Sequence, residues 1–281
     1  MSRILLKTDD HSRDSAGMRY VYPVISRRAG GVSVGINLNP NNACNWRCIY
    51  CQVPDLKRGG PPPLDLALLE RELNEFLHRA VSGDFMTTCV PAGARRLVDV
   101  AFSGNGEPTS AAEFAETVAI VGRVLAGNDL ADEVLMRLIT NGSLLDRKTV
   151  QAGIAQIGRA GGEVWFKLDA GTPAGLVRIN STRTQPESVA RRLARCAALA
   201  PTWVQTCLFR LDGELPAESE MQAYLALLAP LAPDLAGIHL YSLARPSLQK
   251  EAPRLRRMDA EWMEQIAGRI RQLGLTVRVS P

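Results

Sequence analysis

Short apolar segments alternate with longer segments of helical periodicity along most of the chain. The strands that this pattern predicts cover Val32–Leu38, Leu97–Gly104, Glu133–Gly142, Glu163–Ala170, Thr202–Leu211 and Gly237–Leu243, with Leu275–Val279 as a final strand. The predicted helices cover Leu64–Val81, Ala111–Ala126, Leu144–Ile157, Gln185–Leu199, Ala217–Leu231 and Asp259–Leu273. Strict alternation of strand and helix predicts an α/β fold, an incomplete (β/α)6 TIM-like barrel of parallel strands with an N-terminal extension. A flat, doubly wound sheet is the alternative.

Polar side chains recur on one face of the predicted strands. Successive side chains of a strand point to opposite faces, so we expect the apolar register of each strand to face the helices. The opposite register would point into the lumen of a barrel and contains Asn37, Asn39, Asp99, Ser103, Arg137, Asn141, Lys167, Asp169, Gln205, Cys207, His239 and Tyr241. Such a lumen is costly unless its polar groups are paired, hydrated or bound to a ligand. An internal ion-pair network of Arg137, Lys167, Asp99 and Asp169 is the structural alternative to a ligand site.

The strand and helix pattern begins after an N-terminal extension. Residues 1–31 are rich in Arg, Ser and Gly and contain one candidate strand, Arg19–Val24. We therefore divide the chain into this extension and a core domain of residues 32–281. The connectors Gln52–Pro63 and Ser82–Arg96 are irregular loops of that domain, because neither has the length or low complexity of an interdomain linker.

Composition limits the class of protein. The chain has 281 residues, of which 46% are hydrophobic and 22% charged, as is typical of a soluble globular protein. A formal net charge of +4 is too small to indicate nucleic-acid binding without a local patch of cations. No window approaches the roughly 18 apolar residues of a membrane span, and the six cysteines do not resemble a secreted disulfide scaffold. We therefore expect a cytoplasmic protein with reduced thiols.

Cys44, Cys48 and Cys51 follow the first core strand at the spacing C-x3-C-x2-C. Thiolates packed this densely need an electrophile, which means a metal, a disulfide or a cluster. A structural zinc site needs a fourth ligand, usually from a second pair such as C-x2-C or H-x3-H, and the sequence has no such pair. An iron–sulfur cubane held by three thiolates leaves one iron open to an outside ligand. The spacing therefore favours a cluster, with these three cysteines as its ligands.

This cysteine motif, with Tyr50 directly before its last cysteine and a strand in front of it, resembles the signature of the radical SAM superfamily. The resemblance continues at the end of the second core strand. There, the residues Gly104, Asn105, Gly106 and Glu107 resemble the glycine-rich Gly-Gly-Glu motif of the superfamily. That motif holds the amino group of S-adenosylmethionine (SAM), and in this chain an asparagine interrupts the glycine pair.

The next two strands end in further polar residues. Asn141, Lys167 and Asp169 stand where superfamily members contact the methionyl carboxylate and the ribose of SAM. By their chemistry, a lysine pairs with a carboxylate and an aspartate accepts from ribose hydroxyls. The resemblance therefore implies a SAM site built from Tyr50, Gly104, Asn105, Gly106, Glu107, Asn141, Lys167 and Asp169.

The resemblance implies a radical SAM enzyme with a 4Fe-4S cluster and SAM as cofactors. In this superfamily the open iron binds SAM, and an electron from the reduced cluster cleaves its sulfur–carbon bond. The resulting 5'-deoxyadenosyl radical abstracts hydrogen from the substrate. An external one-electron reductant of the flavodoxin or ferredoxin kind supplies the electron. A noncatalytic iron–sulfur or zinc protein on the same scaffold is the alternative function.

Two sequence features bear on the substrate. The segments Gly35–Pro40 and Arg245–Ser247 resemble a branch of the superfamily that includes wyosine-type tRNA base-forming enzymes. Residues 245–257 carry several cations against one acid, Glu251, and would lie at the open rim of the barrel; the cations are Arg245, Lys250, Arg254, Arg256 and Arg257. A tRNA base is therefore one candidate substrate, and a peptide or small metabolite is the other. A solvated basic loop without a partner is the alternative interpretation of this segment.

Three residues of the predicted lumen have two interpretations each. Cys207 is either a packed core residue or a hydrogen-atom donor or auxiliary ligand. His239 and Tyr241 either handle protons in a substrate pocket or form a hydrogen-bonded wall.

Overall fold

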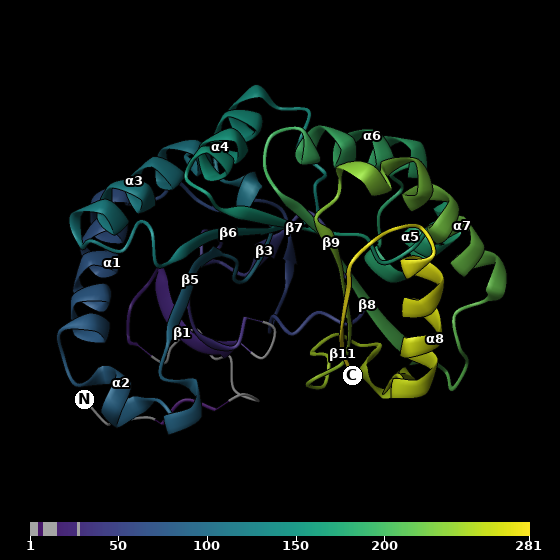
Figure 1. The fold of residues 1–281 in the computed structure, drawn as a ribbon, viewed down its shortest axis with the longest axis horizontal. Helices are drawn as coiled ribbons and strands as arrows, with labels where there is room; N and C mark the ends of the chain where they lie inside the picture. The colour runs from purple at the N-terminus through teal and green to yellow at the C-terminus, as the bar shows by residue number, and fades with distance from the viewer. Residues whose placement is uncertain (1–4, 8–15, 27–28) are drawn as a thin grey trace.

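In the computed structural model, which describes residues 5–7, 16–26 and 29–281, nine strands form one curled sheet (Figure 1). The path runs through β1 (Val21–Ser26), β2 (Gly31–Ile36), β5 (Leu97–Phe102), β6 (Leu135–Thr140), β7 (Glu163–Lys167), β8 (Thr202–Leu211), β9 (Gly237–Ser242) and β11 (Val277–Ser280), and β10 (Leu255–Arg257) pairs with β8. All pairs from β2 to β11 along the path are parallel, whereas β1 and β10 pair antiparallel. The parallel strands lie in chain order without the reversal of a doubly wound sheet. The predicted incomplete TIM-like barrel is therefore confirmed.

The six predicted helices are also present and lie on the outer side of the curled sheet (Figure 1). They are α1 (Leu66–Val81), α3 (Phe114–Gly127), α4 (Lys148–Arg159), α6 (Pro186–Ala197), α7 (Glu218–Leu228) and α8 (Ala260–Arg271). Among the residues described, no helix is both long enough and apolar enough to cross a membrane.

Several short elements were not predicted. They are α2 (Phe85–Cys89), α5 (Pro173–Asn180), the strand pair β3 (Ala43–Cys44) and β4 (Lys57–Arg58), β10, and four short 3-10 helices at Ala92–Ala94, Pro108–Ser110, Ala229–Asp234 and Ala252–Arg254. Helix α5 begins with Pro173 in its first turn, and the Thr172 hydroxyl accepts from the Gly175 N–H at 2.9 Å. Only eight residues long, α5 has too few turns to display a helical period.

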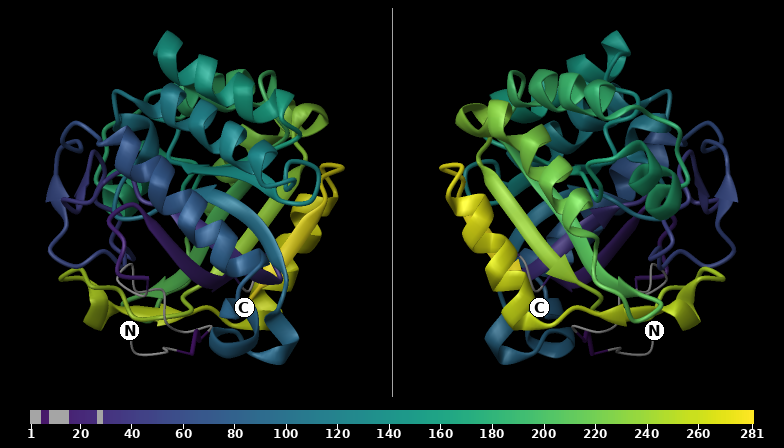
Figure 2. Two further views of the ribbon diagram at one scale, coloured as in Figure 1. Left: turned by 90° about the vertical axis from the view of Figure 1, so that its left-hand side faces the viewer. Right: turned by 90° about the vertical axis from the view of Figure 1, so that its right-hand side faces the viewer.

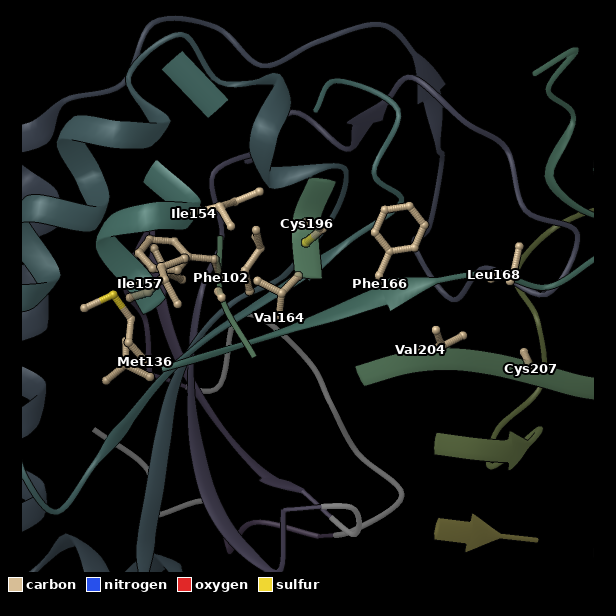
Figure 3. Packing of buried hydrophobic residues seen from close by; sticks show 14 of the residues in the cluster. Phe102, Met136, Ile154, Ile157, Val164, Phe166, Leu168, Cys196, Val204 and Cys207 are labelled. Atoms are coloured by element: carbon tan, nitrogen blue, oxygen red, sulfur yellow. The ribbon is translucent and has the colours of Figure 1, made fainter. Parts of the chain in front are cut away.

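The apolar register of the strands packs against the helices, as predicted. Val34 and Ile36 of β2, like Val164 of β7, are fully buried. Figure 3 shows Val164 and its neighbours beside the side chains of α4, among them Ile154 and Ile157. The polar register is thereby left facing the lumen.

The candidate strand in the N-terminal extension is confirmed as β1, which pairs with β2 at one edge of the sheet. The preceding residues are fixed to helix α1, because the backbone N–H groups of Arg19 and Tyr20 each donate to the Glu72 carboxylate at 2.8 Å. Residues of the extension thus belong to the same sheet as the core. Residues 1–4, 8–15 and 27–28 of the extension lie outside the described residues.

Candidate cofactor site

A cavity of about 300 Å³ occupies the lumen. Its wall combines the cysteine segment with the ends of β5, β6 and β7. The predicted site residues that line it are Cys44, Cys48, Tyr50, Cys51, Gly104, Asn105, Gly106, Glu107, Asn141 and Lys167. The fold therefore brings together residues that lie far apart in the sequence, and of the predicted set only Asp169 lies outside this lining.

The three clustered cysteines are free thiols. Burial raises the pKa of Cys44 and of Cys48 to about 12, so these thiols hold their protons unless a metal replaces them. The Trp46 N–H donates to Cys44 Sγ at 3.5 Å, and Asn180 Nδ2 donates to Cys48 Sγ at 3.2 Å. Such donors stabilise sulfur ligands and are a feature of iron–sulfur sites.

The spacing of these thiols does not match a site for one ion. Within the described part of the chain, no three His, Cys, Asp or Glu side chains are grouped as the ligands of a single metal ion. In a cubane cluster, each thiolate binds a different iron, so the sulfurs need not converge on one point. Three free thiols on one cavity wall, two of them with N–H donors, therefore fit a cluster better than a zinc ion.

The glycine segment lies against the residues that precede the first cysteine. A Cβ atom on Gly106 would lie 2.1 Å from the Ala43 carbonyl oxygen, and Gly104 has a φ of 138° that favours glycine. Both glycines therefore allow residues 104–106 to pack closely against residues 37–43. Between them, Asn105 donates to the Asn42 side chain at 2.7 Å, and its Oδ1 is buried without a hydrogen-bond partner.

Glu107 joins the ends of β5 and β6. Its carboxylate accepts from the Thr109 N–H and hydroxyl (3.1 and 2.6 Å), the Thr140 hydroxyl (2.6 Å) and the Asn141 N–H (2.7 Å). Burial raises the pKa of Glu107, and these hydrogen bonds act in the opposite direction. Asn141 in turn contacts the cysteine segment, because its Nδ2 donates to Asn45 Oδ1 at 2.9 Å.

Asp169 lies behind Tyr50. Its carboxylate accepts from the Tyr50 hydroxyl at 2.6 Å, from Asn180 Nδ2 at 2.8 Å and from the Cys207 N–H at 3.0 Å. Burial, together with this carboxylate, raises the pKa of Tyr50 well above its usual value, so the phenol stays protonated and donates. Asp169 thus fixes the Tyr50 ring and, through Asn180, the environment of Cys48.

Lys167 is the cation of the cavity. Its Nζ donates to the Tyr241 hydroxyl at 3.0 Å and lies 5.0 Å from the centre of the Tyr50 ring. Burial lowers the pKa of Lys167, but the Tyr241 oxygen, Asp169 and Cys48 outweigh burial and raise it overall. The ammonium group is therefore charged and faces a cavity that can take an anionic group.

The amino-terminal part of the lumen contains four residues that we call the floor cluster: Asp99, Arg137, Glu163 and Trp165. Arg137 forms ion pairs with Asp99 and, at 2.7 Å, with Glu163, and its guanidinium lies 4.3 Å from the centre of the Trp165 ring. The Trp165 indole N–H also donates to Glu163 at 2.8 Å. The ion-pair alternative is thus correct for Arg137 and Asp99, but Lys167 and Asp169 have other partners.

Gln205 lies between these two parts of the lumen. It is on β8, paired in register with Lys167 and His239, and it lines the cavity. Its side chain is 1% exposed, yet Nε2 has no hydrogen-bond partner. A buried donor of this kind is costly unless a ligand or water accepts from it.

The sequence did not predict the part played by Asn180. This residue ends helix α5, is fully buried and donates to both Cys48 and Asp169. Its only sequence signal is an asparagine at the end of a short helix that was itself not predicted. Of the residues with two interpretations, His239 lies between Trp165 and Trp203 in tilted contacts, with ring centres 4.5 and 4.8 Å apart, and Cys207 is buried in the cavity wall.

The basic segment at residues 245–257 is largely engaged with the protein itself. Arg254 forms an ion pair with Asp212 at 2.6 Å. Arg256 donates to two neighbouring backbone carbonyls, and Arg257 donates to the Pro281 carbonyl. The acid of the segment, Glu251, pairs with Arg47 at 2.6 Å. Fewer cations are therefore available for phosphate groups than the sequence alone suggests.

Known proteins resemble this chain in sequence and in fold. The Radical SAM superfamily profile matches residues 38–214. A UPF0026 protein of Helicobacter pylori is 25% identical over 237 residues, which is 83% of this chain and 68% of that protein. GTPase Obg of Brachyspira hyodysenteriae is 25% identical over 135 residues, which is 47% of this chain but only 17% of that protein. A radical SAM methyltransferase from Sphaerobacter thermophilus shares the fold, with a TM-score of 0.60 and 14% identity over 92% of this chain and 68% of that one.

Proposed function

Because this chain belongs to the radical SAM superfamily, it is an enzyme with a 4Fe-4S cluster and SAM as cofactors, and we propose that Cys44, Cys48 and Cys51 hold the cluster. When bound, the cluster supplies an electron that splits a sulfur–carbon bond of SAM, which starts radical chemistry on the substrate. The observation that carries the assignment is that all three thiols line one cavity with two unsatisfied buried polar atoms, Asn105 Oδ1 and Gln205 Nε2. Such atoms are expected where a polar ligand completes the site.

SAM then occupies the mouth of the cavity, beside the cluster. Lys167 carries the charge that neutralises the SAM carboxylate, and Asn105 Oδ1 accepts from its amino group. Tyr50 forms an aromatic wall whose position Asp169 fixes. The remaining contacts come from Gly104, Gly106, Glu107 and Asn141. Since the Glu107 carboxylate already has four protein donors, its main contribution is to hold the ends of β5 and β6 around the ligand.

The substrate approaches through the rim, beside Gln52 and Arg245, which line the cavity. Inside, the wall offers Tyr241, Gln205 and Trp165, a combination of aromatic surface and hydrogen-bonding groups. A small molecule or a peptide side chain with a hydrogen-bond acceptor fits these groups best. A tRNA base is the second candidate, and it is favoured by Arg245, which lines the cavity, and by the exposed Lys250 nearby in the sequence.

Anaerobic reconstitution with iron and sulfide tests the cofactor assignment. The loaded protein should form 5'-deoxyadenosine from SAM when dithionite supplies electrons. Cys48→Ala should lose the visible cluster absorbance and reduce 5'-deoxyadenosine to background, because it removes one of three ligands. Cys89→Ala, a matched change at a partly buried cysteine outside the cavity lining, should retain both. A fully loaded protein that forms no 5'-deoxyadenosine, or a Cys48→Ala variant that keeps its cluster, contradicts the assignment.

The substrate class is tested in cells. Metabolites and modified nucleosides would be compared between a deletion strain, the wild type and a strain that carries only Cys48→Ala. A nucleoside missing from tRNA in both altered strains identifies the tRNA base. Accumulation of a small metabolite with unchanged tRNA nucleosides identifies the other class.

A further inference from the structure

Each of the three clustered cysteines contacts a segment that reaches the surface. Cys44 of β3 pairs with Arg58 of β4, and the Cys44 carbonyl accepts from the Gly59 N–H at 3.1 Å. Cys48 Sγ accepts from Asn180, at the end of helix α5. The Cys51 carbonyl accepts from the Leu248 N–H at 2.9 Å. Three surface segments, residues 55–59, 177–183 and 248–250, are therefore hydrogen-bonded to the cysteines.

We call the exposed side chains of these segments the basic face: Lys57, Arg58, Val177, Arg178, Arg183, Leu248 and Lys250. Figure 2 shows that the β3–β4 region, α5 and the loop after β9 project from the same side of the molecule. None of these side chains lines the lumen cavity. The basic face is therefore distinct from the cavity lining.

The face carries a strong excess of positive charge. Its three segments contain five cations and one carboxylate, Asp55. Within the described residues, none of the five cations forms a salt bridge, in contrast to Arg47 beneath them, which pairs with Glu251. Charge that the protein does not neutralise attracts an acidic partner and speeds its association.

Two aliphatic side chains lie among these cations. Leu248 is 58% exposed and Val177 is 50% exposed, and both belong to the few large apolar side chains that the described residues expose. A small apolar patch with a charged rim suits a transient protein contact of low area. RNA is a poorer match, because unpaired bases stack on aromatic side chains, and all the large apolar side chains exposed in the described part of the chain are aliphatic.

We propose that the basic face docks an acidic one-electron carrier protein directly over the cluster. The proposal rests on the assignment of the cluster to Cys44, Cys48 and Cys51. In the docked complex one electron leaves the reduced carrier and enters the oxidised cluster, with no bond formed or broken and no proton transferred. Because the rate of electron tunnelling falls steeply with distance, a face whose backbone bonds directly to two of the cysteines is a short route.

The test compares two electron sources on one charge-reversed variant, Arg58→Glu/Arg183→Glu/Lys250→Glu. With a reduced acidic flavodoxin below saturation and at low salt, the variant should form 5'-deoxyadenosine at least roughly 10-fold more slowly than the wild type, because steering is lost. With dithionite, which needs no docking, the two rates should be equal. Equal dithionite rates also establish that the variant is folded and carries its cluster.

The matched control reverses three exposed cations on other surfaces, Arg71→Glu/Lys148→Glu/Arg159→Glu, with the same change in net charge. The control should keep the flavodoxin-driven rate within about 2-fold of the wild type, because steering is a local effect of the face. A neutral variant, Arg58→Gln/Arg183→Gln/Lys250→Gln, should fall between the wild type and the charge-reversed protein. Equal flavodoxin-driven rates for the wild type and the charge-reversed variant overturn the proposal.

A binding titration separates this proposal from the proposed function. Labelled flavodoxin should bind the wild type more tightly than the charge-reversed variant, and added salt should remove the difference. If the loaded wild type forms no 5'-deoxyadenosine even with dithionite, the proposed function fails, and this titration still decides the docking face. If the variant instead loses binding to tRNA while flavodoxin binding is unchanged, the face is an RNA site and the proposal is wrong.

Discussion

At the amino-terminal end of the lumen, Asp99, Arg137 and Glu163 pair with one another, whereas at the carboxyl end Cys44, Asn105 and Lys167 line an open cavity. Asp99 and Arg137 line the same cavity as the second set, and both sets would be costly in an empty apolar core. The floor cluster satisfies its charges within the protein. At the carboxyl end, by contrast, the buried Asn105 Oδ1 has no hydrogen-bond partner among the described residues. Buried polarity in one barrel therefore indicates either structure or ligand binding, and the hydrogen-bond partners distinguish the two.

Arg137→Met should give the largest loss of stability. The substitution leaves Asp99 and Glu163 buried without their cation, which costs about 3–5 kcal/mol in unfolding free energy. Chemical denaturation of the cluster-free protein measures the loss. Arg254→Met, the same change at an exposed arginine that also pairs with an aspartate, should stay close to the wild type. If the two variants lost equal stability, the floor cluster would not be a structural ion network.

Gly106→Ala tests whether the close approach of Gly106 to Ala43 positions the cysteine segment. A Cβ at this position would lie 2.1 Å from the Ala43 carbonyl oxygen, so the cysteine segment must move. We expect a loss of about 1–3 kcal/mol in unfolding free energy and less iron bound per chain after reconstitution. Gly60→Ala is the control, because a Cβ there meets no atom within 4 Å. An unaffected iron content in Gly106→Ala would show that the close approach does not position the cysteines.

Asn180→Ala tests the support of the cluster outside its ligands. The change removes the N–H donor to Cys48 Sγ and one donor to Asp169. Iron affinity should fall about 10- to 100-fold, as for other residues that orient metal ligands. The reduction potential should also fall, because the lost donor stabilised the more negative, reduced cluster. Competition with a chelator and a redox titration measure both quantities.

The control for this change is Asn74→Ala, at an exposed asparagine of α1. It should alter neither the iron affinity nor the potential. Equal values for Asn180→Ala and the wild type would mean that the hydrogen bond to Cys48 does not stabilise the bound thiolate.

The sequence predicted the parallel sheet and the residues at the strand ends for the same reason. Strands with a strict alternation of side chains must place one register inside a barrel, and parallel strands place their carboxyl ends at one mouth. Cys44, Gly104, Asn141 and Lys167 therefore share a cavity, although up to 123 positions separate them.

The pairing within the site could not be predicted in this way. The resemblance predicts Asp169 at the ribose, and the structure adds three protein donors to its carboxylate, of which Asn180 comes from an unpredicted helix. Likewise, the sequence counts Arg254 among the cations of residues 245–257, whereas in the fold it pairs with Asp212. These outcomes depend on loop geometry and side-chain conformation, which leave no periodic signal in the sequence.

Gln205→Leu should have the smallest effect on stability. It tests whether Gln205 belongs to the structural floor cluster or to the ligand site. Since Gln205 Nε2 has no protein partner, leucine removes an unsatisfied buried donor and should leave the unfolding free energy of the cofactor-free protein within about 1 kcal/mol of the wild type, or raise it. If a ligand normally accepts from this donor, the variant should nevertheless reduce turnover of the substrate while SAM cleavage with dithionite continues. Thr206→Val, one position along β8 with its hydroxyl bonded to the Leu168 carbonyl and the Tyr224 hydroxyl, is the contrasting change and should lose stability. A loss of stability in Gln205→Leu as large as that in Thr206→Val would assign Gln205 to the structural floor.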